Sequence, residues 1–200
     1  LPPLSFREYL VVSGGPAEPV HAAFGDLGWA RDLVLRTNVL AGFRAHVRGG
    51  MRPFFVEGEY ADRLLATVEK TVHVDVPAIV PSVQEQHFRL VKAVLRHLAQ
   101  STVPTVNVDG LCRGWAIGKE KLYGLLDALE ATGLLHIVRY AKDKAVLTKG
   151  AKLLLADPSL YAVLGGDEGT MREAYVVTQA RAAGLEVFAA PDETKGDFVV

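Results

Sequence analysis

One stretch decides how this chain folds: residues 119–140 read KEKLYGLLDALEATGLLHIVRY. Apolar residues recur every three or four positions as far as Ala131, which predicts an amphipathic helix. Gly133 is a typical residue to end such a helix. Residues 134–140 then alternate between apolar and polar side chains, as in a half-buried strand. The stretch therefore predicts a helix that leads directly into a strand.

The flanking residues extend this pattern within the range 84–156. An apolar helix is expected over 88–98 and a shorter helix over 106–112, both ahead of the helix at 119–131. After the strand, the polar residues 142–144 turn the chain into a second short apolar run. Helix, short helix, helix and hairpin is the element order of a winged helix-turn-helix, so we expect a partner-binding surface here.

Composition limits the class of protein. The chain has 200 residues, of which half are hydrophobic and 22% charged, so it can build a core and is not disordered. The net charge is −1, but residues 84–156 hold 11 Lys and Arg against 6 Asp and Glu. This local positive charge makes a polyanionic partner for that part of the chain reasonable.

Cysteine use and hydropathy point to the expected location. Cys112 is the single cysteine, so no intramolecular disulfide can form and a reducing compartment is expected. No stretch approaches 18 uninterrupted apolar residues, and no basic, then apolar, leader opens the chain. We therefore expect a cytoplasmic protein with no membrane partner.

The expected fold class is mainly α with a small α/β part, in three domains. Residues 1–80 form a helical segment, with helices expected at 6–13, 22–48 and 58–74. The first starts with the capping box of Ser5 and Glu8, the second is given Asp26 as its N-cap, and the third is expected to end before Pro77. The winged helix-turn-helix occupies 81–165, and 166–200 form a partial α/β unit.

The last part of the chain alternates helix and strand. Residues 152–155 predict a short buried strand, and Asp157 with Pro158 predicts a helix start. A further helix is expected over 170–183, and two strands over 185–189 and 197–200.

The start of the 119–131 helix is the candidate nucleic-acid surface. In a helix-turn-helix, the N-terminal residues of the second helix face the major groove, and Lys or Tyr there can contact phosphate. The helix has no Arg, Asn or Gln, so base-specific readout is not expected. A protein or intramolecular joint is the alternative. The candidate residues are Lys119, Lys121 and Tyr123 on the helix, and Arg139, Lys142 and Lys144 on the hairpin.

Two carboxylates form the candidate catalytic and metal site. Glu173 on a helix and Asp197 at the start of a strand can converge at one end of a sheet and bind a hard divalent cation. The alternative is an ordinary surface Glu and an ordinary strand-start Asp. Residues 114–120 lack the spacing and the hydroxyl residue of a phosphate-binding loop, so no cofactor is expected within this chain.

Several motifs in order along the chain carry a family resemblance. The run PLSFREYL at 3–10, the Gly49-Gly50 neighbourhood and the helix end at 130–135 resemble elements of bacterial and archaeal AAA-type ATP-binding proteins with a C-terminal domain of unknown function. The stretch 152–160, Gly169 with Glu173, and 197–200 are similar to its later elements. Three positions depart from the family's pattern. Pro53 does not occupy the proline position of the family's GGxP motif, Leu154 replaces an aromatic residue, and Gly196 stands where Val is common.

The resemblance implies that an ATPase core, with its ATP and Mg²⁺, precedes Leu1 in a parent protein. It also implies that the tail is a truncated restriction-endonuclease-like unit, in which Glu173 and Asp197 match two site positions and a third strand would follow Val200. We therefore expect a regulatory or recognition region that binds DNA non-specifically or a protein partner through its winged helix. A metal-dependent nuclease, and a module for protein interaction or self-association, are the alternatives.

Overall fold

The computed structural model describes residues 3–15, 28, 31, 38–81, 83, 87–102, 108–141, 151–190 and 196–200. Of the described residues, 64% are helical and 8% lie in strands, and these strands form two small antiparallel sheets. The predicted class, mainly α with a small α/β part, is confirmed at this level.

In the N-terminal part of the chain, the helices α1 (Phe6–Val12) and α3 (Val39–Gly49) pack together. The predicted capping box starts α1: the Ser5 hydroxyl accepts from the Glu8 N–H at 3.2 Å, and the Glu8 carboxylate accepts from the Ser5 N–H at 2.7 Å. Asn38 caps α3. Asp26, the N-cap expected for the longer helix, lies outside the described residues.

A long helical rod follows, and it continues further than predicted. After the short 3₁₀ helix η1 (Pro53–Glu57) come α4 (Tyr60–Lys70), a π-helical turn η2 (Thr71–Asp75) and α5 (Val76–Ile79). The expectation that the helix ends before Pro77 is wrong. Pro77 lies in the first turn of α5, where proline is well tolerated, and the π turn absorbs the change in hydrogen-bond register.

Three helices come next in the predicted order, followed by a pair of strands. They are α6 (Phe88–Gln100), α7 (Val108–Trp115), α8 (Lys119–Ala131), β1 (Leu135–Val138) and β2 (Lys152–Leu155). The second strand is the stretch 152–155, predicted as a separate buried strand, and the apolar run 145–147 expected to complete the hairpin lies outside the described residues. The two strands are antiparallel, with Leu135 opposite Leu155 and Val138 opposite Lys152. Gly133 ends α8 at φ +70°, and the Leu134 N–H closes the turn on the Leu129 carbonyl at 2.9 Å.

The last elements are α9 (Ser159–Val163), α10 (Glu168–Ala182), β3 (Phe188–Ala189) and β4 (Phe198–Val199). Helix α10 starts two residues before the predicted position 170, because Asp167 caps it by accepting from the Thr170 N–H at 2.7 Å. The predicted strand pair is present but short, with Phe188 opposite Val199.

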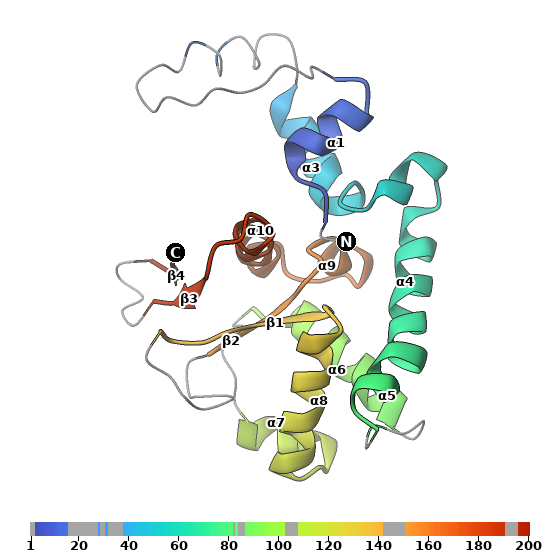
Figure 1. Ribbon diagram of the computed structural model, residues 1–200, viewed down its shortest axis with the longest axis vertical. Helices are drawn as coiled ribbons and strands as arrows, with labels where there is room; N and C mark the ends of the chain where they lie inside the picture. Colours follow the sequence, from blue (N-terminus) through green and yellow to red (C-terminus); the bar gives the residue numbers. More distant parts are fainter. Residues whose placement is uncertain are drawn as a thin grey trace.

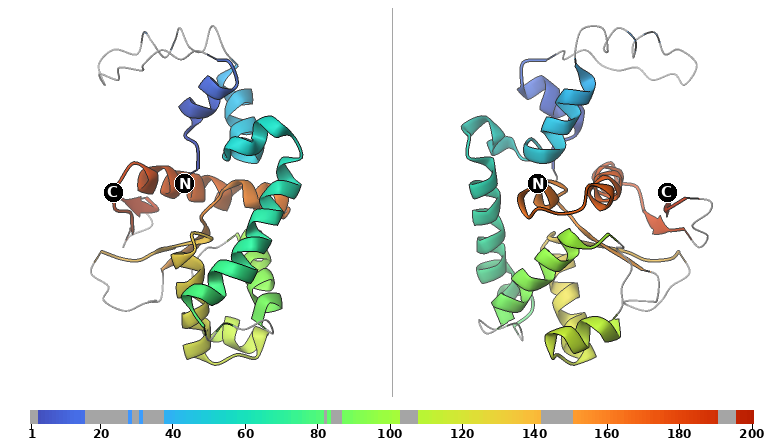
Figure 2. Two further views of the ribbon diagram at one scale, coloured as in Figure 1. Left: turned by 45° about the vertical axis from the view of Figure 1, so that its right-hand side comes forward. Right: turned by 180° about the vertical axis from the view of Figure 1, so that it is seen from behind.

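The three predicted parts share one hydrophobic core. Buried residues from Val47 to Ala189 belong to the same cluster. The rod of α4 runs along the molecule and joins the α1–α3 pair to α5, which packs against α8 (Figures 1 and 2). In turn, α9 contacts α3, α6 and α10, and α10 contacts β2.

One polar joint fixes the N-terminal part to α9. The Arg52 guanidinium donates to the Asp157 carboxylate at 2.6 Å, and the Tyr60 and Ser159 hydroxyls hydrogen-bond at 2.9 Å. Asp157 also accepts from the Ser159 N–H at 3.0 Å, so its carboxylate shapes the start of α9 as well. Arg52 and Asp157 lie far apart in the sequence, so the joint forms only when the tertiary fold brings them together.

Candidate functional site

The first turn of α8 presents exposed charge at a helix N-terminus. Gly118 precedes the helix in an extended conformation and offers no side chain to cap it. Lys119, Glu120 and Lys121 are all exposed. The partial positive charge of the uncapped N–H groups adds to that of the two lysines, so this turn can attract an anion.

Lys119 has a partner on α7. Its ammonium lies 2.8 Å from the Asp109 carboxylate, and both side chains are more than half exposed. The hydrogen bond and the charge of Lys119 lower the pKa of Asp109, and those of Asp109 raise the pKa of Lys119. An ion pair this exposed to water contributes little to stability, so Lys119 can leave Asp109 for another anion at small cost.

Lys121 makes no ion pair with any described residue, and it borders a hollow between α6 and α8. The hollow has a volume of about 390 Å³, and Val83, Leu90 and Leu125 supply its apolar lining. Burial, followed by the charge of Lys121, lowers the pKa of His87 in the same lining. This face therefore combines a free cation with an apolar depression.

The remaining predicted nucleic-acid residues do not extend this surface among the described residues. Tyr123 is half-buried and packs against the core. Arg139 is half-buried too, and its guanidinium donates to Glu130 on α8 at 2.9 Å. Lys142 and Lys144 lie outside the described residues. Lys119 and Lys121 both lie in the exposed first turn of α8, but Lys119 faces Asp109 of α7 and Lys121 borders the hollow beside α6. Arg139 is turned toward the body of the protein.

Glu130 is the centre of a charged cluster that the sequence reasoning missed. It accepts from the Ile137 N–H at 3.1 Å and lies 3.7 Å from Arg181 of α10. Arg181 donates in turn to the Ile137 carbonyl at 2.9 Å and contacts Nδ1 of His136 at 3.1 Å. Burial, together with the charge of Arg181, lowers the pKa of His136 to about 4, against the opposing effect of Glu130.

Glu173 and Asp197 do converge, but on a lysine. Lys152 of β2 donates to Glu173 at 2.9 Å and to Asp197 at 2.7 Å, and its ammonium lies 4.8 Å from the centre of the Phe198 ring. The Lys152 side chain is only 9% exposed, against 25% for Glu173 and 56% for Asp197. Burial lowers the pKa of Lys152, but the two carboxylates raise it by more, so the ammonium stays charged.

A resident divalent cation does not fit these residues as they are arranged. Hard cations take about six oxygen ligands, and only two carboxylates converge here. Across the described part of the chain, no three His, Cys, Asp or Glu side chains are grouped to hold a metal ion. The Lys152 ammonium already supplies the positive charge between the two carboxylates, so the cluster is a closed ion-pair network.

Replacing Lys152 with methionine is expected to raise the affinity for Mn²⁺ about 10-fold, because it removes a positive charge next to two carboxylates. Both carboxylates are partly exposed, so water can solvate them in the variant. Isothermal titration with MnCl₂ measures the change. Lys70→Met, at an exposed position on α4, is the matched control. Two results would contradict the prediction: equal Mn²⁺ affinity in wild type and Lys152→Met, or an increased affinity in Lys152→Met that persists when Asp197→Asn is added. Either would show that the Lys152 ammonium does not keep a cation from binding between the two carboxylates.

No protein-family model, curated protein or solved structure matches this chain. The roles of its site residues are therefore inferred from the geometry of the site alone. Among the helices described, none combines the length and apolar character needed to cross a lipid bilayer.

Proposed function

We propose that this chain is a regulatory and recognition region that docks onto duplex DNA, without sequence preference, through a winged helix. The winged helix comprises α6, α7, α8 and the β1–β2 hairpin. In this proposal the chain is the C-terminal part of an AAA-type ATP-binding protein, whose nucleotide state would be coupled to docking. The observation that carries the proposal is the exposed pair Lys119 and Lys121 at the uncapped start of α8.

The chemistry of this turn favours phosphate over bases. Lysines and helix N–H groups bind phosphate oxygens, and these contacts position a protein on DNA without reading its sequence. Asp109 and Glu120 lie close to the two lysines and reduce their attraction for a polyanion. We therefore expect weak affinity that falls steeply as salt is added.

Lys121→Gln is the variant that tests this docking. With a short fluorescein-labelled duplex, the slope of log affinity against log salt should fall in magnitude by about 1, and equally for two unrelated sequences. Arg7→Gln is the matched control, since Arg7 is exposed on α1 at the far end of the molecule from α8 (Figure 1). Fluorescence anisotropy measures both.

Three outcomes would count against the proposal: no binding to any duplex at low salt, binding that ignores salt, or equal slopes for the two variants. In those cases a protein partner becomes the better candidate. The apolar hollow between α6 and α8, with Lys121 and Glu120 at its edge, favours that second function. A metal-dependent nuclease is not favoured, because Lys152 lies between the two carboxylates such a site would use.

A further inference from the structure

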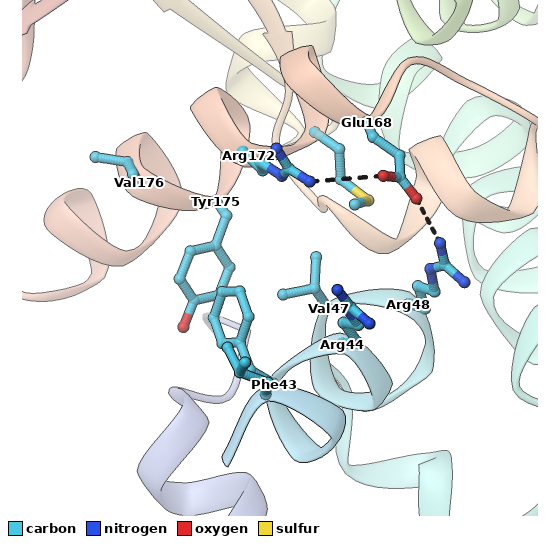
Figure 3. A pocket seen from close by; sticks show the side chains of 10 residues that line it. Phe43, Arg44, Val47, Arg48, Glu168, Arg172, Tyr175 and Val176 are labelled. Atoms are coloured by element: carbon cyan, nitrogen blue, oxygen red, sulfur yellow. Dashed lines mark hydrogen bonds and ion pairs between the residues drawn. The ribbon is translucent and has the colours of Figure 1, made fainter. Parts of the chain in front are cut away.

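A groove separates α3 from α10, on a different part of the molecule from α8. It has a volume of about 440 Å³. Val47 and Met171 form a buried apolar floor, and the rings of Phe43 and Tyr175 meet edge to face at 5.0 Å between centroids (Figure 3). Burial raises the pKa of Tyr175 to about 12, so its ring stays neutral.

Apolar side chains also reach the surface along this groove. Leu40 is 71% exposed and Val176 is 51% exposed, and both line it. Scattered exposed leucines and valines are common on proteins, but these two continue the buried floor outward. The apolar lining is therefore accessible from solvent.

The charges around the groove are unbalanced. Three guanidiniums, those of Arg44, Arg48 and Arg172, line it together with the single carboxylate of Glu168 (Figure 3). Glu168 pairs with Arg48 and, at 3.6 Å, with Arg172. Arg44 makes no ion pair with any described residue. One exposed guanidinium is thus left beside an apolar floor.

We infer that this groove binds a small anionic amphiphile: an apolar chain or ring that carries one carboxylate. Arg44 receives the carboxylate, because a guanidinium donates two parallel hydrogen bonds to it. The apolar part covers Val47, Met171 and the two rings. A volume of this size is typical of small-ligand pockets, which combine an apolar lining with a few polar groups. The inference is independent of DNA docking.

Decanoate is the test ligand, with decyltrimethylammonium and decanol as probes that share its chain but not its charge. Isothermal titration of the wild-type chain should show decanoate binding about 10-fold more tightly than either, since hydrogen bonds to charged groups discriminate by this much. Arg44→Gln should remove that preference. Arg113→Gln, at an exposed position on α7, is the matched control and should keep it.

A second variant protects the test against loss of the fold. Val176→Glu changes an exposed residue and adds a carboxylate to the groove. It should weaken decanoate binding and leave decanol binding within a few-fold of wild type. Equal affinity of the wild type for the three probes, no decanoate binding, or unchanged preference in Arg44→Gln would each overturn the inference.

Discussion

Replacing Arg52 with methionine is expected to lower the free energy of unfolding by about 3 kcal/mol, because it leaves the buried Asp157 carboxylate without its cation. The Asp157 side chain is only 4% exposed, and the Arg52 guanidinium, 2.6 Å away, is its cation. Asp157 keeps its hydrogen bond from the Ser159 N–H in the variant, but a single neutral donor does not replace the lost guanidinium. Urea unfolding at neutral pH, followed by circular dichroism, measures the loss.

Asp157→Asn provides the background that isolates this charge effect. Asparagine keeps an oxygen to accept from the Ser159 N–H but carries no charge. In that background Arg52→Met should cost less than about 1 kcal/mol, so the two substitutions should couple strongly in a double-mutant cycle. If Arg52→Met costs the same in both backgrounds, its packing rather than its charge holds α9 to the N-terminal part.

Local patterns in the sequence predicted most of the elements. The 3.6-residue periodicity located α6 and α8, and the capping box of Ser5 and Glu8 located the start of α1. Gly133 located the end of α8 because a left-handed residue was needed there. The π turn before Pro77 was not predictable in this way, because it packs against α6, whose residues lie further along the chain.

The site residues were harder to predict, because their partners are remote in the chain. The sequence predicts that Glu173 and Asp197 converge, but it does not predict that Lys152 lies between them. A signal was present in the sequence. Lys152 opens the apolar stretch KLLL, which is predicted to be a buried strand, and a buried ammonium needs carboxylate partners. Arg139 likewise pairs with a carboxylate that is not adjacent in the sequence, that of Glu130. Its position directly after a strand had favoured an exposed side chain.

The second large effect concerns pH and the cluster around Glu130. The pKa of His136 is lowered from 6.5 to about 4, so the unfolded chain binds one more proton than the folded chain between these values. Stability must therefore rise with pH across this window and fall on acidification, by about 3 kcal/mol in total from this residue. Burial of the ring is the larger cause of this lowered pKa, and protonation would also place a second cation 3.1 Å from the Arg181 guanidinium.

His136→Asn should remove this contribution, since its side-chain oxygen accepts from Arg181 as Nδ1 does but does not titrate. The free energy of unfolding, measured by urea at pH values from about 4 to 7, should fall by about 3 kcal/mol less in the variant than in wild type. His97→Asn, at an exposed position on α6, should follow the wild-type curve. Parallel curves for wild type and His136→Asn would mean that folding does not lower the pKa of this ring, so that Glu130 offsets the effects of burial and Arg181.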